Sequence, residues 1–218
     1  DDCGNFSQCS QTVTKEDNTA PVISCAANKT INCAAAVVFD DPTATDNCDP
    51  TPTITVVSTV GTAGACPQES SFTRTWRATD DCGNFSQCSQ TVTKEDNVKP
   101  VLSGCPAPTA SFTCLSQVPP PATVTATDNC AGTVPVNFRE TQSNPGSSCN
   151  NVITRIWTAT DPCNNKDSCL QVITVNDNVK PVLSGCPPPA SFSCLSQVPP
   201  PAPVTATDNC AGTVPVIF

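Results

Sequence analysis

The sequence predicts an all-β fold made of tandem antiparallel β-sandwiches, each about 80 residues long and stapled by disulfides. Three observations support this prediction. The stretch DDCGNFSQCSQTVTKEDN fills positions 1–18 and returns unchanged at 80–97, and such identity at a fixed period is typical of repeat proteins. The composition is rich in Thr, Ser and Val and includes 23 Pro, which favours extended, turn-rich structure. Finally, 17 of the 218 residues are cysteine.

Asp-Asn pairs mark the end of each repeat. They stand at 17/18, 96/97 and 177/178, so that one repeat is 79 to 81 residues long. We therefore expect four parts: the C-terminal fragment of a repeat at 1–18, whole immunoglobulin-like repeats at 19–97 and 98–178, and the N-terminal fragment of another repeat at 179–218. The chain is expected to be a segment of a longer array, and its function must be sought in the single repeat.

Short β-prone runs follow one another along the repeat at 19–97, separated by Gly, Pro, Asn and Asp, which favour turns. The expected strands are 21–25, 29–33, 35–39, 51–60, 70–78 and 86–94. Strands at this spacing are typical of an antiparallel sandwich. Side chains on one face of a strand alternate with those on the other, so the inward residues should be Phe72, Trp76 and Ala78, then Val152 or Ile153, Trp157 and Ala159.

Charge and composition exclude several functions. The net charge of −9 disfavours nucleic acid and anionic membranes as partners, and we expect no membrane insertion in this segment. The sequence lacks histidine, a G-x-S-x-G motif and a glycine-rich phosphate loop, so no enzyme is expected. A hydrolase using Asp46 and Asp80 is disfavoured as well, because sugar clefts need aromatic residues and the chain has two Trp and no Tyr.

Each whole repeat carries six cysteines without a CxxC pair, which favours disulfides over zinc and an extracellular or cell-surface location. A unit this small also needs covalent support. Alternating strand directions sort the loops between the two ends of the sandwich and predict one set of pairs. The expected bridges are Cys25–Cys88, Cys33–Cys66, Cys48–Cys82, Cys105–Cys169, Cys114–Cys149 and Cys130–Cys163.

The same sorting gathers carboxylates and amides where one repeat meets the next, and oxygen ligands of this kind suit calcium. We expect the first junction to use Glu16, Asp17, Asn18, Asp46, Asn47, Asp49, Asp80 and Asp81. The second would use Glu95, Asp96, Asn97, Asp128, Asn129 and Asp161, and the third Asp177, Asn178, Asp208 and Asn209. The alternative is that Asp and Asn stand there only because turns favour them.

Asn-x-Ser/Thr patterns, which are acceptors for N-glycans, occur at Asn5, Asn28 and Asn84. Such patterns also arise by chance, and Asn5 and Asn84 alternatively form the tight turn before the last strand.

The layout of the repeat resembles the hyalin repeat, an immunoglobulin-like extracellular module found in tandem on surface and matrix proteins. The better matches are the motif Cys82-Gly83-Asn84 and the prolines after the linkers, Pro21, Pro100 and Pro181. The chain departs from the family at Cys25-Ala26 and at Cys163-Asn164-Asn165, and its six cysteines exceed the family's usual pair. The linker TVNDNVKPVL at 174–183 also resembles the calcium-binding linker of cadherins.

These expectations favour an extracellular structural protein, a stalk or filament of tandem repeats that associates with itself and has junctions stiffened by calcium. Near-identical neighbouring copies suit a spacer. The alternative is a cell-surface adhesin that binds glycan or protein through the loops at 61–70 and 142–151, which differ between repeats.

Overall fold

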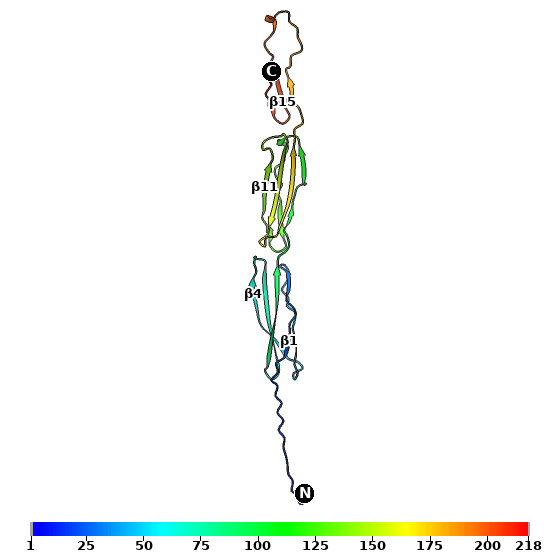
Figure 1. Cartoon of the computed structure of the whole chain (residues 1–218), viewed down its shortest axis with the longest axis vertical. Coiled ribbons are helices and arrows are strands. Elements are labelled where there is room, and N and C mark those ends of the chain that lie inside the picture. Colours follow the sequence, from blue (N-terminus) through cyan, green and yellow to red (C-terminus); the bar gives the residue numbers. More distant parts are fainter. Residues whose placement is uncertain (1, 218) are drawn as a thin grey trace. The chain divides into compact units, whose positions relative to one another are not determined.

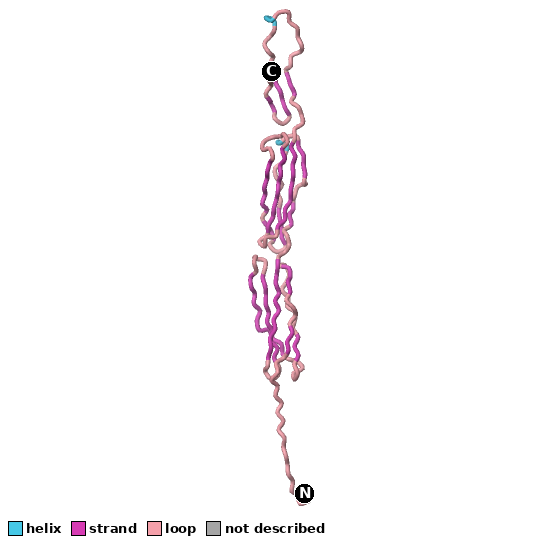
Figure 2. Tube along the Cα trace, viewed as in Figure 1, coloured by secondary structure: helices cyan, strands magenta, loops and turns pink. Residues whose placement is uncertain are grey.

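A computed structural model of the chain describes residues 2–217. Its regular secondary structure consists of β-strands and two short 3-10 segments, joined by long stretches of turn and irregular structure (Figures 1 and 2). The chain divides into two compact units, one ending at Asn97 and the other beginning at Val98. No helix within residues 2–217 is long and apolar enough to cross a membrane.

Unit 1 contains a four-stranded sheet in the order β2-β6-β5-β4 and a separate pair of strands, β1 and β3. The bounds are β1 Val22–Ser24, β2 Lys29–Asn32, β3 Thr43–Thr45, β4 Thr53–Ala63, β5 Ser70–Thr79 and β6 Phe85–Glu95. All pairs are antiparallel except β2 with β6, which run parallel. This is the expected sandwich of two sheets, with one parallel edge.

The strand expected at 35–39 does not form. Residues 36–42 instead cross the repeat without regular structure, and the next strand, β3, begins at Thr43. The reason is that contacts with side chains, rather than backbone hydrogen bonds to a neighbouring strand, hold this segment against the sheet. The ring of Phe39 packs edge-on against Trp76 with centroids 6.0 Å apart, and the guanidinium of Arg74 lies 4.3 Å from the Phe39 ring. We call residues 36–42 the strap.

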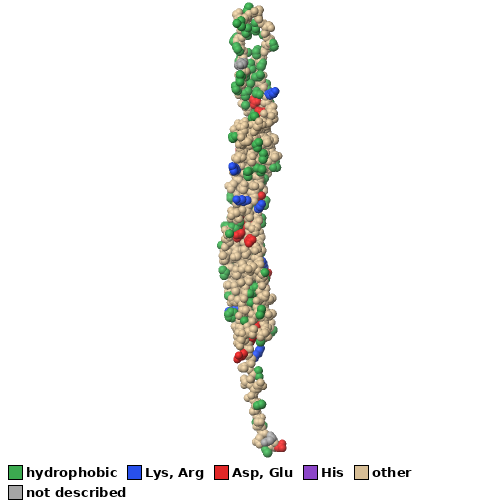
Figure 3. Space-filling model, in the orientation of Figure 1, with side chains coloured by type: hydrophobic (Ala, Val, Ile, Leu, Met, Phe, Trp, Pro, Cys, Tyr) green, Lys and Arg blue, Asp and Glu red, His purple; other side chains and the backbone are tan. Residues whose placement is uncertain are grey.

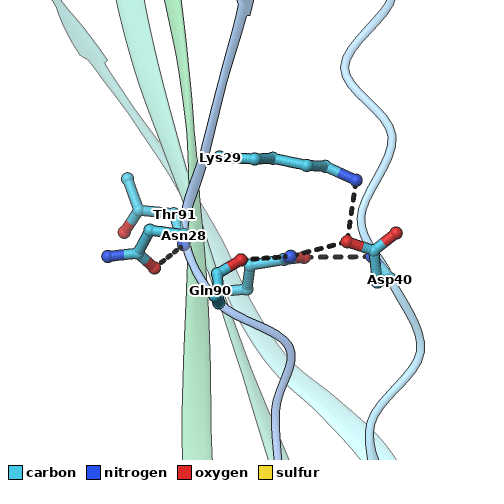
Figure 4. A network of polar contacts seen from close by, with 6 residues as sticks. Asn28, Lys29, Asp40, Gln90 and Thr91 are labelled. Atoms are coloured by element: carbon cyan, nitrogen blue, oxygen red, sulfur yellow. Dashed lines mark hydrogen bonds and ion pairs between the residues drawn. The ribbon is translucent and has the colours of Figure 1, made fainter.

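A buried glutamine holds the strap to the sheet (Figure 4). Gln90 of β6 is fully buried. Its Nε2 donates to Asp40 Oδ2 at 2.7 Å and to Ala27 O at 2.9 Å, and its Oε1 accepts from Asp40 N at 3.0 Å. Lys29 Nζ lies 2.8 Å from Asp40 Oδ2. The hydrogen bonds from Lys29 and then Gln90 hold the pKa of Asp40 below its usual range.

Unit 2 repeats this plan with a four-stranded sheet, β11-β12-β13-β8, and a three-stranded sheet, β10-β9-β7. A second three-stranded sheet, β14-β15-β16, belongs to the partial repeat that follows. The bounds are β7 Val101–Ser103, β8 Thr109–Phe112, η1 Leu115–Gln117, β9 Thr125–Asp128, β10 Gly132–Val134, β11 Val136–Gln142, β12 Asn151–Thr160, β13 Lys166–Val175, β14 Val182–Ser184, η2 Leu195–Gln197, β15 Thr205–Asp208 and β16 Gly212–Val214.

The core of each repeat is small and centres on a tryptophan strand. Trp76 and Ala78 are buried in unit 1, as are Trp157 and Ala159 in unit 2, so the expected inward faces of these strands are confirmed. Phe72 is only half-buried, and of the two candidates in unit 2 Ile153 is buried while Val152 is exposed. Charged side chains are few and scattered on the face drawn in Figure 3.

Candidate functional site

The linker that enters unit 1 is attached to the turn between β5 and β6. Asn84 Nδ2 donates to the backbone oxygen of Asp17 at 3.0 Å, and Ser86 Oγ donates to the backbone oxygen of Pro21. The Asp17 side chain accepts from Thr19 N at 3.1 Å. These contacts fix where the chain enters the repeat, and they bring the linker carboxylate to the aspartate-rich turns.

Three carboxylates meet at this entry: one oxygen each from Asp17, Asp46 and Asp80 lies within 4.8 Å of the others. Asp80 is buried and Asp17 and Asp46 are half-buried. The backbone N–H groups of Asp49 and then Cys48 donate to Asp46 and lower its pKa, so Asp46 carries a negative charge. Like charges this close repel one another, and a cation would relieve the repulsion.

Asp46 has a spare ligand atom. Its Oδ1 accepts the two turn hydrogen bonds at 2.9 Å each, whereas its Oδ2 is buried with no hydrogen-bond partner in residues 2–217. Asp80 is different, because its Oδ1 accepts from Cys82 N and Asn84 N and its Oδ2 from Asn84 Nδ2 at 2.8 Å. A buried carboxylate oxygen without a donor is costly, and a bound cation would satisfy this oxygen.

The remaining candidates at this junction are not brought into the cluster. Glu16, Asn18 and Asn47 are exposed, and Asp49 is buried but accepts from Thr51 N at 2.9 Å in its own turn. Asp81 is exposed and lines a hollow of about 60 Å³ together with Lys15, Asp17, Cys48, Asp49 and Cys82. The ammonium of Lys15 is therefore a rival to a metal ion for neutralising these carboxylates.

The second set of candidates is divided between the units. Glu95, Asp96 and Asn97 close unit 1, where Asn97 Nδ2 donates to Glu95 Oε2 at 3.2 Å. In unit 2, Asp128 repeats the pattern of Asp46: its Oδ1 accepts from Cys130 N and Ala131 N at 2.8 Å, and its buried Oδ2 has no partner within the described chain. Asp161 repeats the pattern of Asp80, and Asn129 is exposed.

The third set lies within unit 2. One oxygen each from Asp177 and Asp208 lies within 4.8 Å of the other and of Cys210 Sγ. Backbone hydrogen bonds, first from Ala211 and then from Cys210, lower the pKa of Asp208. Asn178 Oδ1 accepts from Asn176 at 3.1 Å. Asn209 Nδ2 donates to Cys210 Sγ at 3.0 Å and to Cys114 Sγ at 3.3 Å.

The turn motif explains why the second repeat tolerates a departure from Cys-Gly-Asn. Gly83 has φ +89° and its counterpart Asn164 has φ 69°, a left-handed conformation that glycine and asparagine adopt most readily. Asn84 and Asn165 then close the turn on Asp80 and Asp161 in the same way. Turn formation therefore accounts for part of the Asp and Asn content, as the alternative interpretation holds.

Two of the expected disulfides are present: Cys25 is bonded to Cys88 and Cys105 to Cys169. Each joins the segment at or just after the first strand to the last strand of the same repeat. Cys33, Cys66, Cys130 and Cys163 are oxidised as well. The structure therefore places the majority of the cysteines, ten of 17, in disulfides.

Two expected pairs are wrong. Cys114 is bonded not to Cys149 but to Cys210, which lies in the turn between β15 and β16 of the following repeat, and Cys149 is a free, exposed thiol. Cys48 and Cys82 line the same hollow but are not bonded to each other. Desolvation and then the neighbouring Asp17 carboxylate raise the pKa of Cys48, because its thiol faces the linker. Cys48 and Cys82 do lie at the same end of the repeat, as predicted, but the predicted pairing joins cysteines only within one repeat, whereas Cys114 bonds to the next repeat.

The glycan acceptors differ in their surroundings. Both hydrogens of the Asn84 amide are engaged, with Asp17 O and Asp80 Oδ2, so a glycan there would break the turn. Asn28 is exposed and accepts from Thr91 N through its oxygen at 2.8 Å (Figure 4), which leaves its nitrogen as the attachment atom. Asn5 is exposed.

Comparison with known families matches two stretches of the chain, residues 21–93 and 105–175, to an HYR-like domain with 4 cysteines. The expected resemblance to hyalin repeats is thereby confirmed. No curated protein matches the chain. HYR-like domains are non-catalytic repeat domains, and their disulfides are typical of extracellular or secreted proteins. Since the matched stretches cover more than half of the sequence, the chain belongs to the family of HYR-like domains with four cysteines.

Proposed function

We propose that the chain is part of an extracellular structural stalk or filament, in which tandem HYR-like repeats are joined end to end and associate with further copies of themselves. The observation that carries this proposal is the disulfide between Cys114 and Cys210, which bonds one repeat to the next. A covalent tie beyond the peptide linker restrains the motion of one repeat against its neighbour. A spacer needs this restraint, whereas a chain of independent binding modules does not.

Calcium at the repeat entry would stiffen the linker further. Asp17 comes from the linker, whereas Asp46 and Asp80 come from two turns of the repeat, so an ion shared by their oxygens would tie the linker to the domain. Calcium takes six to eight oxygen ligands. The three carboxylates supply part of this set, and water molecules would complete it.

The rival function is adhesion, with glycan or protein bound at an exposed loop. Residues 143–150 favour it, because this loop is well ordered by its own side chains: Asn144 Nδ2 donates to Cys149 O at 2.9 Å and Asn151 Nδ2 donates to Ser147 O at 3.1 Å. The loop at 64–69 in unit 1 has a different sequence, and a rigid, variable loop is suited to recognition.

Electron microscopy and glycan arrays separate the two functions. The native material is imaged after negative staining, and the purified chain is applied to a glycan array. Filaments or long beaded rods together with an empty array support the structural role. Isolated short particles that bind a defined glycan, with binding lost when residues 143–150 are replaced by the loop at 64–69, would instead establish adhesion and overturn the proposal.

A further inference from the structure

Six cysteine positions recur in both whole repeats, and the partial repeats hold some of the same positions. The first position holds Cys25, Cys105 and Cys186, the second Cys33, Cys114 and Cys194, and the third Cys48, Cys130 and Cys210. The fourth holds Cys66 and Cys149, the fifth Cys3, Cys82 and Cys163, and the sixth Cys9, Cys88 and Cys169. The first and sixth are bonded to each other within each whole repeat.

The other four positions do not follow that rule. The second cysteine is oxidised in both whole repeats, but the third and fifth are oxidised only in the second of them, at Cys130 and Cys163, and are free at Cys48 and Cys82. The fourth is oxidised only in the first, at Cys66, and is free at Cys149. Two repeats with the same cysteine positions would show the same oxidation state if these bonds closed within a repeat.

The pattern fits bonds between successive repeats. A bond from the second cysteine of one repeat to the third of the next is present as Cys114–Cys210. This rule leaves Cys48 and Cys194 without a counterpart in the sequence, and both are free. A bond from the fourth cysteine to the fifth of the next repeat similarly leaves Cys149 and Cys82 without a counterpart, and both of these are free as well.

We propose that two disulfides cross every junction between repeats, one from the second cysteine to the third of the following repeat and one from the fourth to the fifth. The rule rests on repeat position and oxidation state, and it assigns Cys33 to Cys130 and Cys66 to Cys163. It goes beyond the proposed function, because it holds whether the array is a stalk or an adhesin.

The surroundings of the free thiols agree with this assignment. Cys48 and Cys82 line one hollow with the linker residues Lys15 and Asp17, so the third and fifth cysteines stand together where the chain enters a repeat. In unit 2, Cys149 lines a hollow of about 340 Å³ with Asp177 and with Cys210 and Ala211 of the following repeat. The fourth cysteine therefore already faces the next repeat, beside the bond that is present.

Each bond forms from two thiols, which lose two protons and two electrons as the S–S bond is made. The acceptor is the disulfide of a thiol-disulfide oxidant in the extracellular or secretory compartment, which is reduced to two thiols by exchange through a mixed disulfide. Such an oxidant is general to compartments where structural disulfides form.

Alkylation of the 218-residue chain, produced by itself, tests the rule. The chain is unfolded without reduction in the presence of iodoacetamide, and peptides are mapped by mass spectrometry. We expect adducts on Cys3, Cys9, Cys48, Cys82, Cys149, Cys186 and Cys194, and a linked peptide pair carrying Cys114 and Cys210. A Cys48–Cys82 or Cys114–Cys149 pair would overturn the proposal.

Single variants identify the remaining partners. We expect Cys66→Ser to give one new adduct at Cys163 and Cys114→Ser one at Cys210, whereas Cys149→Ser, the matched control, leaves all other adducts unchanged. A new adduct at Cys33 in Cys66→Ser would show closure within the repeat and refute the rule. If a variant fails to fold, the peptide pairs of the unaltered chain still decide, since Cys66 linked to Cys33 contradicts the rule and Cys66 linked to Cys163 supports it.

Discussion

The buried glutamine that holds the strap offers the sharpest stability test. Replacement of Gln90 by Leu keeps the side-chain volume similar but removes three hydrogen bonds, two donated by Nε2 and one accepted by Oε1. A neutral hydrogen bond contributes about 1 kcal/mol net and one to a charged group about 1.5–3 kcal/mol. The Asp40 side chain is 49% exposed, so water replaces much of its lost bond, and we expect a loss of about 2–4 kcal/mol.

Urea denaturation under non-reducing conditions measures this loss, with Gln87→Leu as the matched control, because Gln87 lies on the same strand and is exposed. The second repeat offers an internal comparison. The side chain of its equivalent residue, Gln171, makes one hydrogen bond within residues 2–217, donated by Nε2 to Ala107 O at 3.3 Å, so Gln171→Leu should cost less than Gln90→Leu. Equal losses in the Gln90 and Gln87 variants would refute the account of the strap.

Three further predictions follow from the charged groups. Calcium at a hundredfold excess over its dissociation constant should stabilise the chain by about 2.7 kcal/mol and so raise its melting temperature. The Asp46→Asn variant should lose this rise, whereas the control variant Asp41→Asn, at an exposed position, should keep it. An unchanged rise in Asp46→Asn would exclude the site. Folding lowers the pKa of Asp40, so the contribution of its carboxylate to folding stability is complete above the ordinary pKa of about 3.9 and is lost as the pH falls through the lower folded-state pKa. The acid unfolding curves of Asp40→Asn and the unaltered chain should therefore converge at that low pH. Curves that stay parallel would contradict this. Arg155 is buried and pairs with the partly exposed Glu140 at 2.7 Å, so Arg155→Met should cost about 2–3 kcal/mol in urea denaturation, and a neutral effect would show that the pair is dispensable.

The strands could be predicted from the sequence where the alternation of apolar side chains agrees with the neighbouring strands that the fold supplies. Trp76 and Trp157 lie on inward faces because alternation along a strand decides which side chains are buried. The limits appear in the identical stretches at 1–18 and 80–97. In the second, residues Phe85–Glu95 form strand β6 between β5 and β2, whereas residues 5–18 form no strand. Strand formation depends on a neighbouring strand, which no local propensity supplies.

The partners of the cysteines and carboxylates could be predicted only in part, for a related reason. A repeat places equivalent cysteines at the same end of every unit, so sequence position alone does not distinguish Cys149 from Cys210 as the partner of Cys114. The sequence indicates which aspartates lie in turns, but it does not indicate which carboxylate oxygen of each accepts the hydrogen bonds of its turn. Asp49 uses its carboxylate within its own turn, and Asp46 keeps one oxygen without a partner.

The central claim is that successive repeats are held to one another by more than the linker, and cryo-electron microscopy of the native assembly tests it most directly. The account predicts repeats at a constant spacing and angle, with continuous density between Cys114 and Cys210 and between the equivalent cysteines of each following junction. Repeats at widely varying angles, with no density joining these sulfur atoms, would contradict it.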